Sequence, residues 1–134
     1  MSNLETKFGG ILDDLKNDQV IDVNMEHASI GDSEIRALAS ILKNTEKLKK
    51  LTLKKNRITD RGLTSLLDSL VGSNVEVVDL SYNKITPVSF NAFKNFKLKN
   101  QKLRYVNLKN NDIPISLKRK KASEFSKIGL IFDF

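Results

Sequence analysis

The chain repeats one spacing of apolar residues four times, and this periodicity constrains its fold more than any other feature. Each unit has apolar residues at positions 1, 4, 6 and 11, and the last three units have Asn at position 9. The units begin at Val20, Leu48, Val75 and Leu103, so the successive steps are 28, 27 and 28 residues. A fixed period in this range is typical of a solenoid, in which each unit buries its apolar face only against its neighbours.

The Asn residues at position 9 have a chemical role in such a stack. The backbone turns inward at every coil, and its buried N–H and C=O groups need partners. An Asn amide both donates and accepts, so it can bond the backbone of its own coil and of the next one. A single Asn after a strand indicates only a turn. Three in register predict a structural ladder, formed by Asn56, Asn83 and Asn111.

The units resemble leucine-rich repeats, and their length resembles the ribonuclease-inhibitor-like subclass, found in tropomodulin and NOD-like receptors. The first unit departs from the pattern with Met25 and Ala28, as an atypical terminal repeat would. The resemblance covers roughly residues 20–134. It implies an α/β fold, a right-handed solenoid with a short parallel sheet on the concave face and helices on the convex face. The matching residues are scaffold positions, so the resemblance implies no functional residue.

We expect one domain in three parts: an N-terminal capping segment over 1–19, four strand units with helices over 20–115, and a last helix with a capping strand over 116–134. The segments between the templates have helical spacing. Asp32 or Ser33 is the expected N-cap of the first such helix, and Pro87 is expected to open the third. In that third helix an apolar face is expected to fill the core, through Phe90, Phe93 and Phe96.

Both ends of the chain carry further signals. Gly9 and Gly10 interrupt an amphipathic segment, which predicts either a short helix after Gly10 or a kinked one. A further step of 28 residues predicts a fifth strand starting at Ile131, with an exposed edge near Phe132 and Phe134. We expect a monomer, with self-association through this edge as the alternative. The helix before that strand is expected to use three apolar residues, Leu117, Phe125 and Ile128.

Composition bounds the function. The chain has no Cys and one His, so we expect no disulfide, no thiolate or His-pair metal site and no cofactor. No secretory signal or membrane-length apolar run is recognised, and we expect a cytoplasmic location, with the nucleus as the alternative. Residues 1–46 hold 4 basic and 9 acidic side chains, whereas residues 47–134 hold 19 and 7. This asymmetry favours an acidic partner for the second part.

The outward strand positions are free of core duty, and they are the candidate contact surface. Four of the five outward positions of the second strand are Lys, and the next two strands add Tyr and Arg, which often anchor interfaces. The candidate partner-binding residues are Lys50, Lys54, Lys55, Asp79, Tyr82, Arg104, Tyr105, Asn107 and Lys109.

Three functions compete. The first is a non-enzymatic protein–protein interaction module that binds an acidic partner through the concave face. The second is binding of nucleic acid or anionic lipid by the basic C-terminal half, where residues 118–121 form a run of four basic side chains. The third, an enzyme, is not expected, because we recognise no phosphate loop, no metal-ligand cluster and no nucleophile paired with a base.

Overall fold

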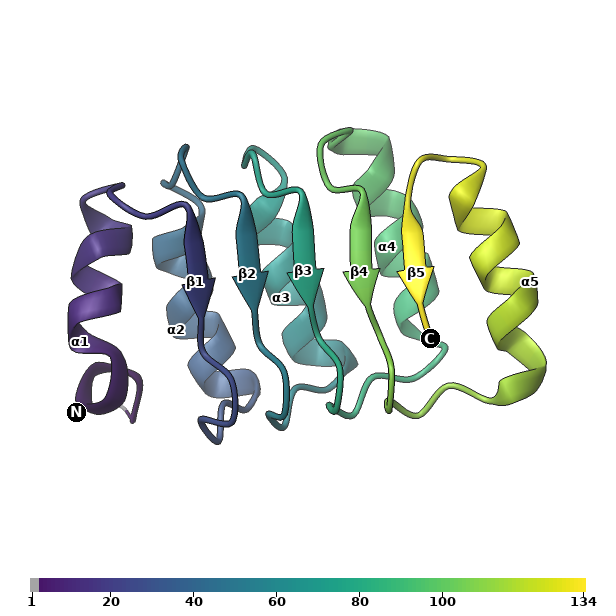
Figure 1. Cartoon of the computed structure of the whole chain (residues 1–134), viewed down its shortest axis with the longest axis horizontal. Helices are drawn as coiled ribbons and strands as arrows, with labels where there is room; N and C mark the ends of the chain where they lie inside the picture. Colours follow the sequence, from purple (N-terminus) through teal and green to yellow (C-terminus); the bar gives the residue numbers. More distant parts are fainter. Residues whose placement is uncertain (1–2) are drawn as a thin grey trace.

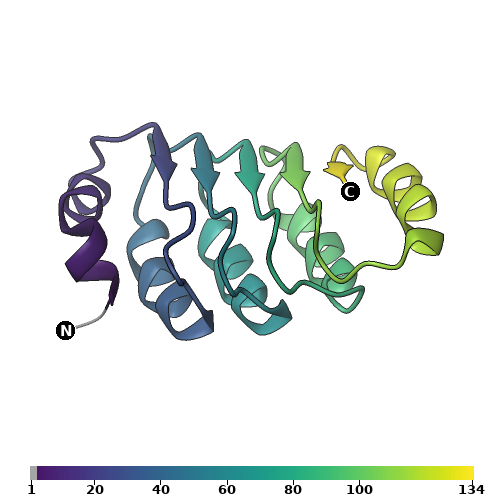
Figure 2. The same cartoon turned by 60° about the horizontal axis from the view of Figure 1, so that its bottom comes forward.

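The computed structural model describes residues 3–134, in which helices and strands alternate along the whole chain (Figure 1). Five parallel strands form one sheet in the order β1-β2-β3-β4-β5. The helices α2, α3 and α4 lie in a row on one side of that sheet, as Figure 2 shows. The elements are α1 (Asn3–Lys16), β1 (Asp22–Asn24), α2 (Asp32–Leu42), β2 (Lys50–Thr52), α3 (Asp60–Leu70), β3 (Val77–Asp79), α4 (Ser89–Lys99), β4 (Tyr105–Asn107), α5 (Ile115–Ser126) and β5 (Ile131–Asp133).

The strand register follows the sequence period. Template position 4 forms one continuous buried row across the sheet, because each strand pairs its central residue with the central residue of the next. That row consists of Val23, Leu51, Val78, Val106 and Phe132. On either side of it, the outer residues of each strand face away from the helices, as the alternation of a strand requires. The core therefore lies between the sheet and the helices.

The Asn side chains at position 9 join neighbouring coils. The Oδ1 atom of Asn56 accepts the N–H groups of Ala28 and Ile30, at 3.0 and 2.9 Å. Its Nδ2 donates to the carbonyl oxygens of Met25 and Leu53, at 3.0 and 2.9 Å. Asn83 and Asn111 repeat this arrangement one and two coils later. These bonds satisfy backbone groups that would otherwise be buried without partners.

A second set of bonds between coils uses the first residue of a helix. The Asp32 carboxylate accepts the N–H and the hydroxyl of Thr59, and Asp60 does the same for Thr86. The expected cap at Asp32 or Ser33 is wrong by one or two residues. The N-cap is Gly31, whose N–H donates to the Glu34 side chain at 2.8 Å. The Asp32 side chain is engaged by the next coil and does not cap its own helix.

The N-terminal helix is continuous but kinked. Phe8 has non-helical angles, φ −130° and ψ 25°, directly before Gly9 and Gly10. Of the two expected alternatives, the structure shows the kinked helix. Its buried residues, Leu4, Leu12 and Leu15, belong to the same core as the repeats. The capping role of segment 1–19 stays a prediction, and its first two residues lie outside the described part of the chain.

The C-terminal strand differs from the expected one by two residues. Phe132, rather than Phe134, occupies the row of Val106, and Ile131 faces outward with 49% of its surface exposed. Phe132 is buried, and its ring lies 4.9 Å from Phe93 and 4.7 Å from Phe125 between centroids. The expectation of exposed phenylalanines at the sheet edge is therefore wrong. Ile128, which was expected in the helix, follows the end of α5 and is largely exposed.

One charged side chain lies inside this end of the core. Lys97 of α4 is only 3% exposed, and its Nζ donates to the carbonyl oxygen of Leu103 at 2.7 Å. No ion pair holds it within residues 3–134. Burial lowers the pKa of the Lys97 ammonium from the ordinary value of 10.5, because the charged form loses hydration.

This burial predicts a pH dependence of stability. In the pH range between the lowered pKa and 10.5, the unfolded chain binds more protons than the folded one. The free energy of unfolding should therefore rise with pH across this range. Lys97→Met removes the titrating group, so the variant should lack this rise. Urea unfolding of both proteins at several pH values from 7 to 10.5 measures the difference. Parallel curves for wild type and variant would contradict the expectation.

Candidate functional site

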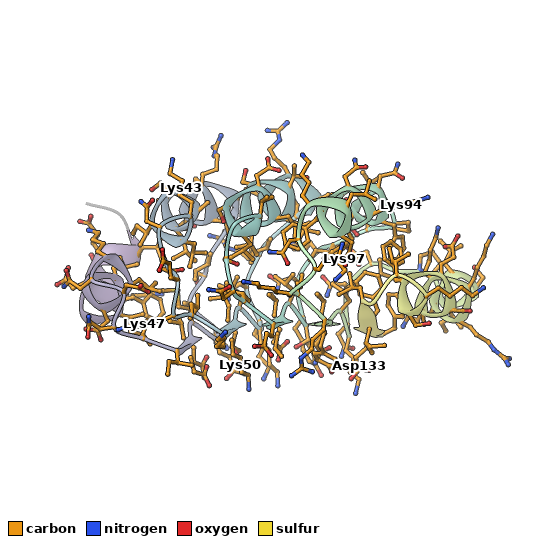
Figure 3. All side chains as sticks on the ribbon, turned by 90° about the horizontal axis from the view of Figure 1, so that it is seen from above. Lys43, Lys47, Lys50, Lys94, Lys97 and Asp133 are labelled. Carbon is orange, nitrogen blue, oxygen red and sulfur yellow. The ribbon has the colours of Figure 1, made fainter. Side chains whose placement is uncertain are left out.

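We call the side of the sheet that faces away from the helices the sheet face, which is the concave side of the expected arc. Two rows of outward side chains run across it, because the strands are in register. The first row consists of Asp22, Lys50, Val77, Tyr105 and Ile131, and the second of Asn24, Thr52, Asp79, Asn107 and Asp133. Figure 3 shows Lys50 and Asp133 projecting on this side, whereas Lys43 and Lys94 project on the helix side.

The residue at template position 8 has a left-handed backbone in every unit. The φ angles are 53° at His27, 58° at Lys55, 57° at Tyr82 and 58° at Asn110. A residue with a Cβ rarely adopts this conformation, and the bonds of the following Asn or Ala to the neighbouring coil fix it here. The side chains at position 8 therefore stand at the margin of the sheet face, and all four are exposed.

Tyr82 is the exposed aromatic side chain of this margin. It is 47% exposed, and the ammonium groups of Lys54 and Lys55 lie 5.8 and 5.6 Å from its ring centroid. Both distances are within the range of cation–π attraction, which is weak at an exposed site, about 0.5–1 kcal/mol. The three side chains form a small cluster, apolar at its centre and positive at its sides. We call it the Tyr82 cluster.

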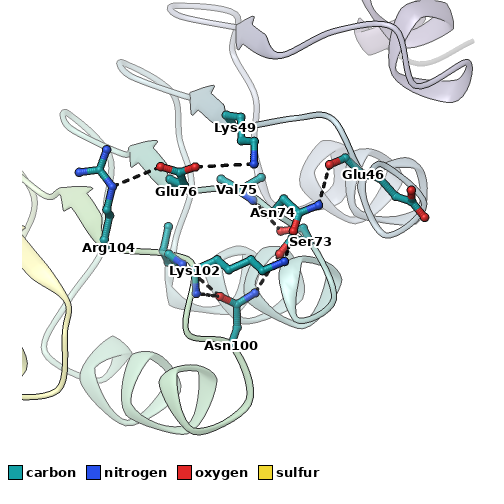
Figure 4. A network of polar contacts seen from close by, with 10 residues as sticks. Glu46, Lys49, Ser73, Asn74, Val75, Glu76, Asn100, Lys102 and Arg104 are labelled. Atoms are coloured by element: carbon teal, nitrogen blue, oxygen red, sulfur yellow. Dashed lines mark hydrogen bonds and ion pairs between the residues drawn. The ribbon is translucent and has the colours of Figure 1, made fainter.

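Most other charges on the sheet face are paired across neighbouring strands. Glu76 lies between Lys49 at 3.7 Å and Arg104 at 3.3 Å, a bridge that Figure 4 shows beside the bonds of Asn74 and Asn100. Lys54 pairs with Glu26 at 3.8 Å, and Lys109 with Asp133 at 3.5 Å. Such exposed pairs stabilise little, but they offset the positive charge of the face.

Several predicted contact residues are engaged within the fold. The Tyr105 hydroxyl donates to Asp133 at 2.9 Å. Partial burial, followed by this bond and by the charges of Asp133 and Asp79, raises the pKa of Tyr105 above 10. Asp79 and Asn107 accept the N–H groups two residues ahead, at 2.9 and 3.0 Å, and so shape the turns after their strands.

The structure thus divides the predicted residues into two groups. Tyr82, Lys50 and Lys55 are exposed, and no ion pair within residues 3–134 holds either lysine. The others have partners on neighbouring strands. Sequence reasoning missed the acidic members of those pairs, Glu26, Glu76 and Asp133. Their signal was available, because each lies about one repeat, 27 or 28 residues apart, from its basic partner or one residue off that spacing.

The described part of the chain offers no obvious place for catalysis or a metal. Among residues 3–134, no three His, Asp or Glu side chains are grouped so as to hold an ion. None of the helices in that range is both long and apolar enough to span a bilayer. The basic run 118–121 lies on α5, where Arg119 and Lys120 are exposed.

Comparison with known proteins bears on the fold. Two family models of leucine-rich repeats match the chain, one over residues 46–67 and 99–113 and the other over residues 74–96. The solved structure of the leiomodin-1 actin-binding site 2 superposes with a TM-score of 0.77 at 20% identity, covering 95% of this chain and 79% of that one. No curated protein matches the sequence. At this identity the structural likeness shows a shared fold.

Proposed function

Because this chain is a leucine-rich repeat protein with repeats of the ribonuclease-inhibitor-like and tropomodulin type, we propose that it is a non-enzymatic module that binds an acidic protein through its sheet face. The single observation that carries this proposal is the Tyr82 cluster. An aromatic ring that is half exposed between two ammonium groups has no role in the core. It suits a carboxylate-bearing surface, which would cover the ring and meet the lysines.

The rest of the sheet face supports recognition more than affinity. The pairs Glu26–Lys54, Glu76–Arg104 and Asp133–Lys109 present alternating signs across the strands. Charges of this kind mainly steer association and select the partner, whereas a buried aromatic anchor supplies binding energy. We therefore place the centre of the contact at Tyr82, Lys55 and Lys50, with Arg104, Tyr105 and Lys109 at its border.

A first candidate partner comes from the structural neighbour. The leiomodin-1 domain is named as an actin-binding site, and it shares this fold over nearly the whole chain. Actin is therefore the first purified protein to test. A fold is compatible with many partners, so the test should also be open to others.

The proposed experiment is affinity capture from cell lysate, with purified actin in a parallel assay. The test variant is Tyr82→Asn with Lys55→Asn, because Asn tolerates the left-handed backbone of these two positions. The matched control is His27→Asn, which changes the same template position in the acidic first unit. We expect capture of the partner to fall about thirtyfold in the test variant, the loss typical of a 2 kcal/mol anchor, and to persist in the control. Equal capture by the test variant and wild type would reject the sheet-face contact.

The basic C-terminal half supports a second candidate function, binding of nucleic acid or anionic lipid. Its specific observation is α5, whose Arg119 and Lys120 are exposed next to Lys118 and Lys121. Affinity for phosphates falls steeply with salt, by orders of magnitude over a fourfold rise when several contacts are made. Repeating the capture at 50 and 200 mM salt separates the two. Loss at the higher salt together with indifference to Tyr82→Asn would favour the second function.

A further inference from the structure

The last helix leaves the row formed by the other helices. α2, α3 and α4 lie side by side beneath the sheet, whereas α5 lies beyond the last strand, at the end of the stack (Figures 1 and 2). α5 is fixed there by Phe125, its one buried side chain, whose ring is 5.8 Å from Phe90 and 4.7 Å from Phe132. The flank of α4 that a further stacked helix would cover is therefore open.

A groove follows from this departure. Its cavity volume is about 310 Å³, and it lies between the first half of α4 and the end of α5. Phe90, Phe125 and the 43% exposed Ile128 supply its apolar surface. Leu98, which is 78% exposed, extends this apolar line, because Phe90, Lys94 and Leu98 are spaced four residues apart on one side of α4. The line is about 12 Å long at 1.5 Å per residue.

The margin of this groove is positive. Lys94 on α4 and Lys121 and Lys127 on the other side face a single acid, Glu124. The Lys121 ammonium lies 2.9 Å from Glu124 and 5.3 Å from the centroid of Phe90. The hydrogen bond from Lys121, together with the charges of Lys121, Lys120 and Lys94, lowers the pKa of Glu124 against the opposing effect of desolvation. Three cations therefore surround an apolar floor with only one of them neutralised.

We propose that this α4–α5 groove binds an acidic amphipathic helix of another protein. An apolar stripe about 12 Å long matches two turns of a helix, with side chains at i, i+4 and i+7 as anchors. Carboxylates flanking that stripe would meet Lys94 and Lys127 at the two sides. The α4 flank is where a neighbouring helix packs elsewhere in this stack, so the occupant would continue the row of helices.

A second copy of this chain is a poor occupant. Its acidic N-terminal helix α1 has the matching charge, but its apolar residues Leu4, Leu12 and Leu15 are already buried in its own core. The exposed apolar residues of the groove would gain nothing from its polar side. The occupant must therefore offer free apolar side chains, which places it on a different protein.

The groove proposal does not depend on the sheet-face contact, and different variants test it. A phage-displayed library of 16-residue peptides is selected on the whole protein, with counter-selection on Lys94→Glu/Lys127→Glu. We expect enriched peptides with apolar residues at helical spacing between Asp and Glu. The strongest peptide, labelled for fluorescence anisotropy, should bind the groove variant at least tenfold more weakly than wild type.

The control variant is Lys43→Glu/Lys47→Glu, which makes the same change of net charge at exposed residues far from the groove. It should bind the peptide as wild type does, and circular dichroism should show both variants folded. Equal weakening in the two variants would overturn the proposal, because it would reflect net charge alone. So would a selection that yields no acidic apolar pattern, or groove-dependent binding to phosphatidylserine vesicles without any selected peptide. Weakening by Tyr82→Asn/Lys55→Asn would place the peptide on the sheet face instead, and would equally overturn it.

Discussion

Asn83→Ala is expected to lower the free energy of unfolding by about 3–4 kcal/mol, a large part of the stability of a domain of this size. The Asn83 Oδ1 accepts the N–H of Ile58 at 2.9 Å, and its Nδ2 donates to the carbonyl oxygens of Leu53 and Leu80 at 3.0 Å each. Alanine leaves these backbone groups buried without partners, and each such group costs about 1–3 kcal/mol. Urea unfolding followed by circular dichroism measures the loss.

The matched control is Asn95→Ala, which changes an exposed Asn on α4 and should stay within about 0.5 kcal/mol of wild type. Asn83 lies in the third of five coils, and the unit it supports has neighbours on both sides. The m-value is therefore informative as well as the midpoint, because uncoupling of the coils on its two sides would lower the cooperativity of unfolding. A loss below 1 kcal/mol in Asn83→Ala would show that the ladder is not needed for stability.

Phe132→Ala is expected to cost about 3–5 kcal/mol, the range for removing a buried Phe. Its ring contacts four others, with centroid distances of 5.8 Å to Phe90, 4.9 Å to Phe93, 4.7 Å to Phe125 and 5.4 Å to Phe134. These contacts hold both β5 and α5 against the stack. The variant should therefore lose protection of the C-terminal unit first, which hydrogen exchange can resolve residue by residue.

Ile131→Ala is the control for this substitution, because it lies next to Phe132 on the same strand but faces outward. It should change stability by no more than about 0.5 kcal/mol. If Phe132→Ala unfolds with wild-type stability, or if exchange rises evenly over all five strands, the C-terminal unit is not held by the aromatic cluster.

The sequence period predicted the repeat strands because their apolar residues do two things at once. Leu51 and Val78, for example, face the core within their own coil and pair with each other across the sheet. A shift of either residue would expose it, so periodicity and register have one solution. The alternation of helices and strands, the parallel sheet and the leucine-rich repeat family were confirmed for the same reason.

The end of the chain escaped the period for a local reason. The step from Val106 to Phe132 is 26 residues rather than 28, because the connection after α5 is tight. Gly129 has φ +85°, and the N–H of Leu130 returns to the carbonyl oxygen of Phe125 at 3.0 Å. A glycine in this conformation ends a helix abruptly. The repeat pattern alone carries no information about the length of a connection that no later unit repeats.

The candidate site could be predicted only in outline. The outward positions were evident from the template, but each was considered on its own strand. Whether Arg104 and Lys54 are free depends on what the neighbouring strands present, and Glu76 and Glu26 occupy those places. The sign of a whole half of the chain likewise does not tell which face carries the charge. In the structure the basic excess gathers around α4 and α5, and the sheet face is nearly balanced.

The measurement that tests the central claim most directly is hydrogen exchange of this protein with and without its captured partner, read by mass spectrometry. The sheet-face proposal predicts slower exchange in peptides that cover residues 50–55 and 79–82, with no such slowing in Tyr82→Asn/Lys55→Asn. Protection confined to the ends of α4 and α5, with residues 50–55 and 79–82 unchanged, would contradict it.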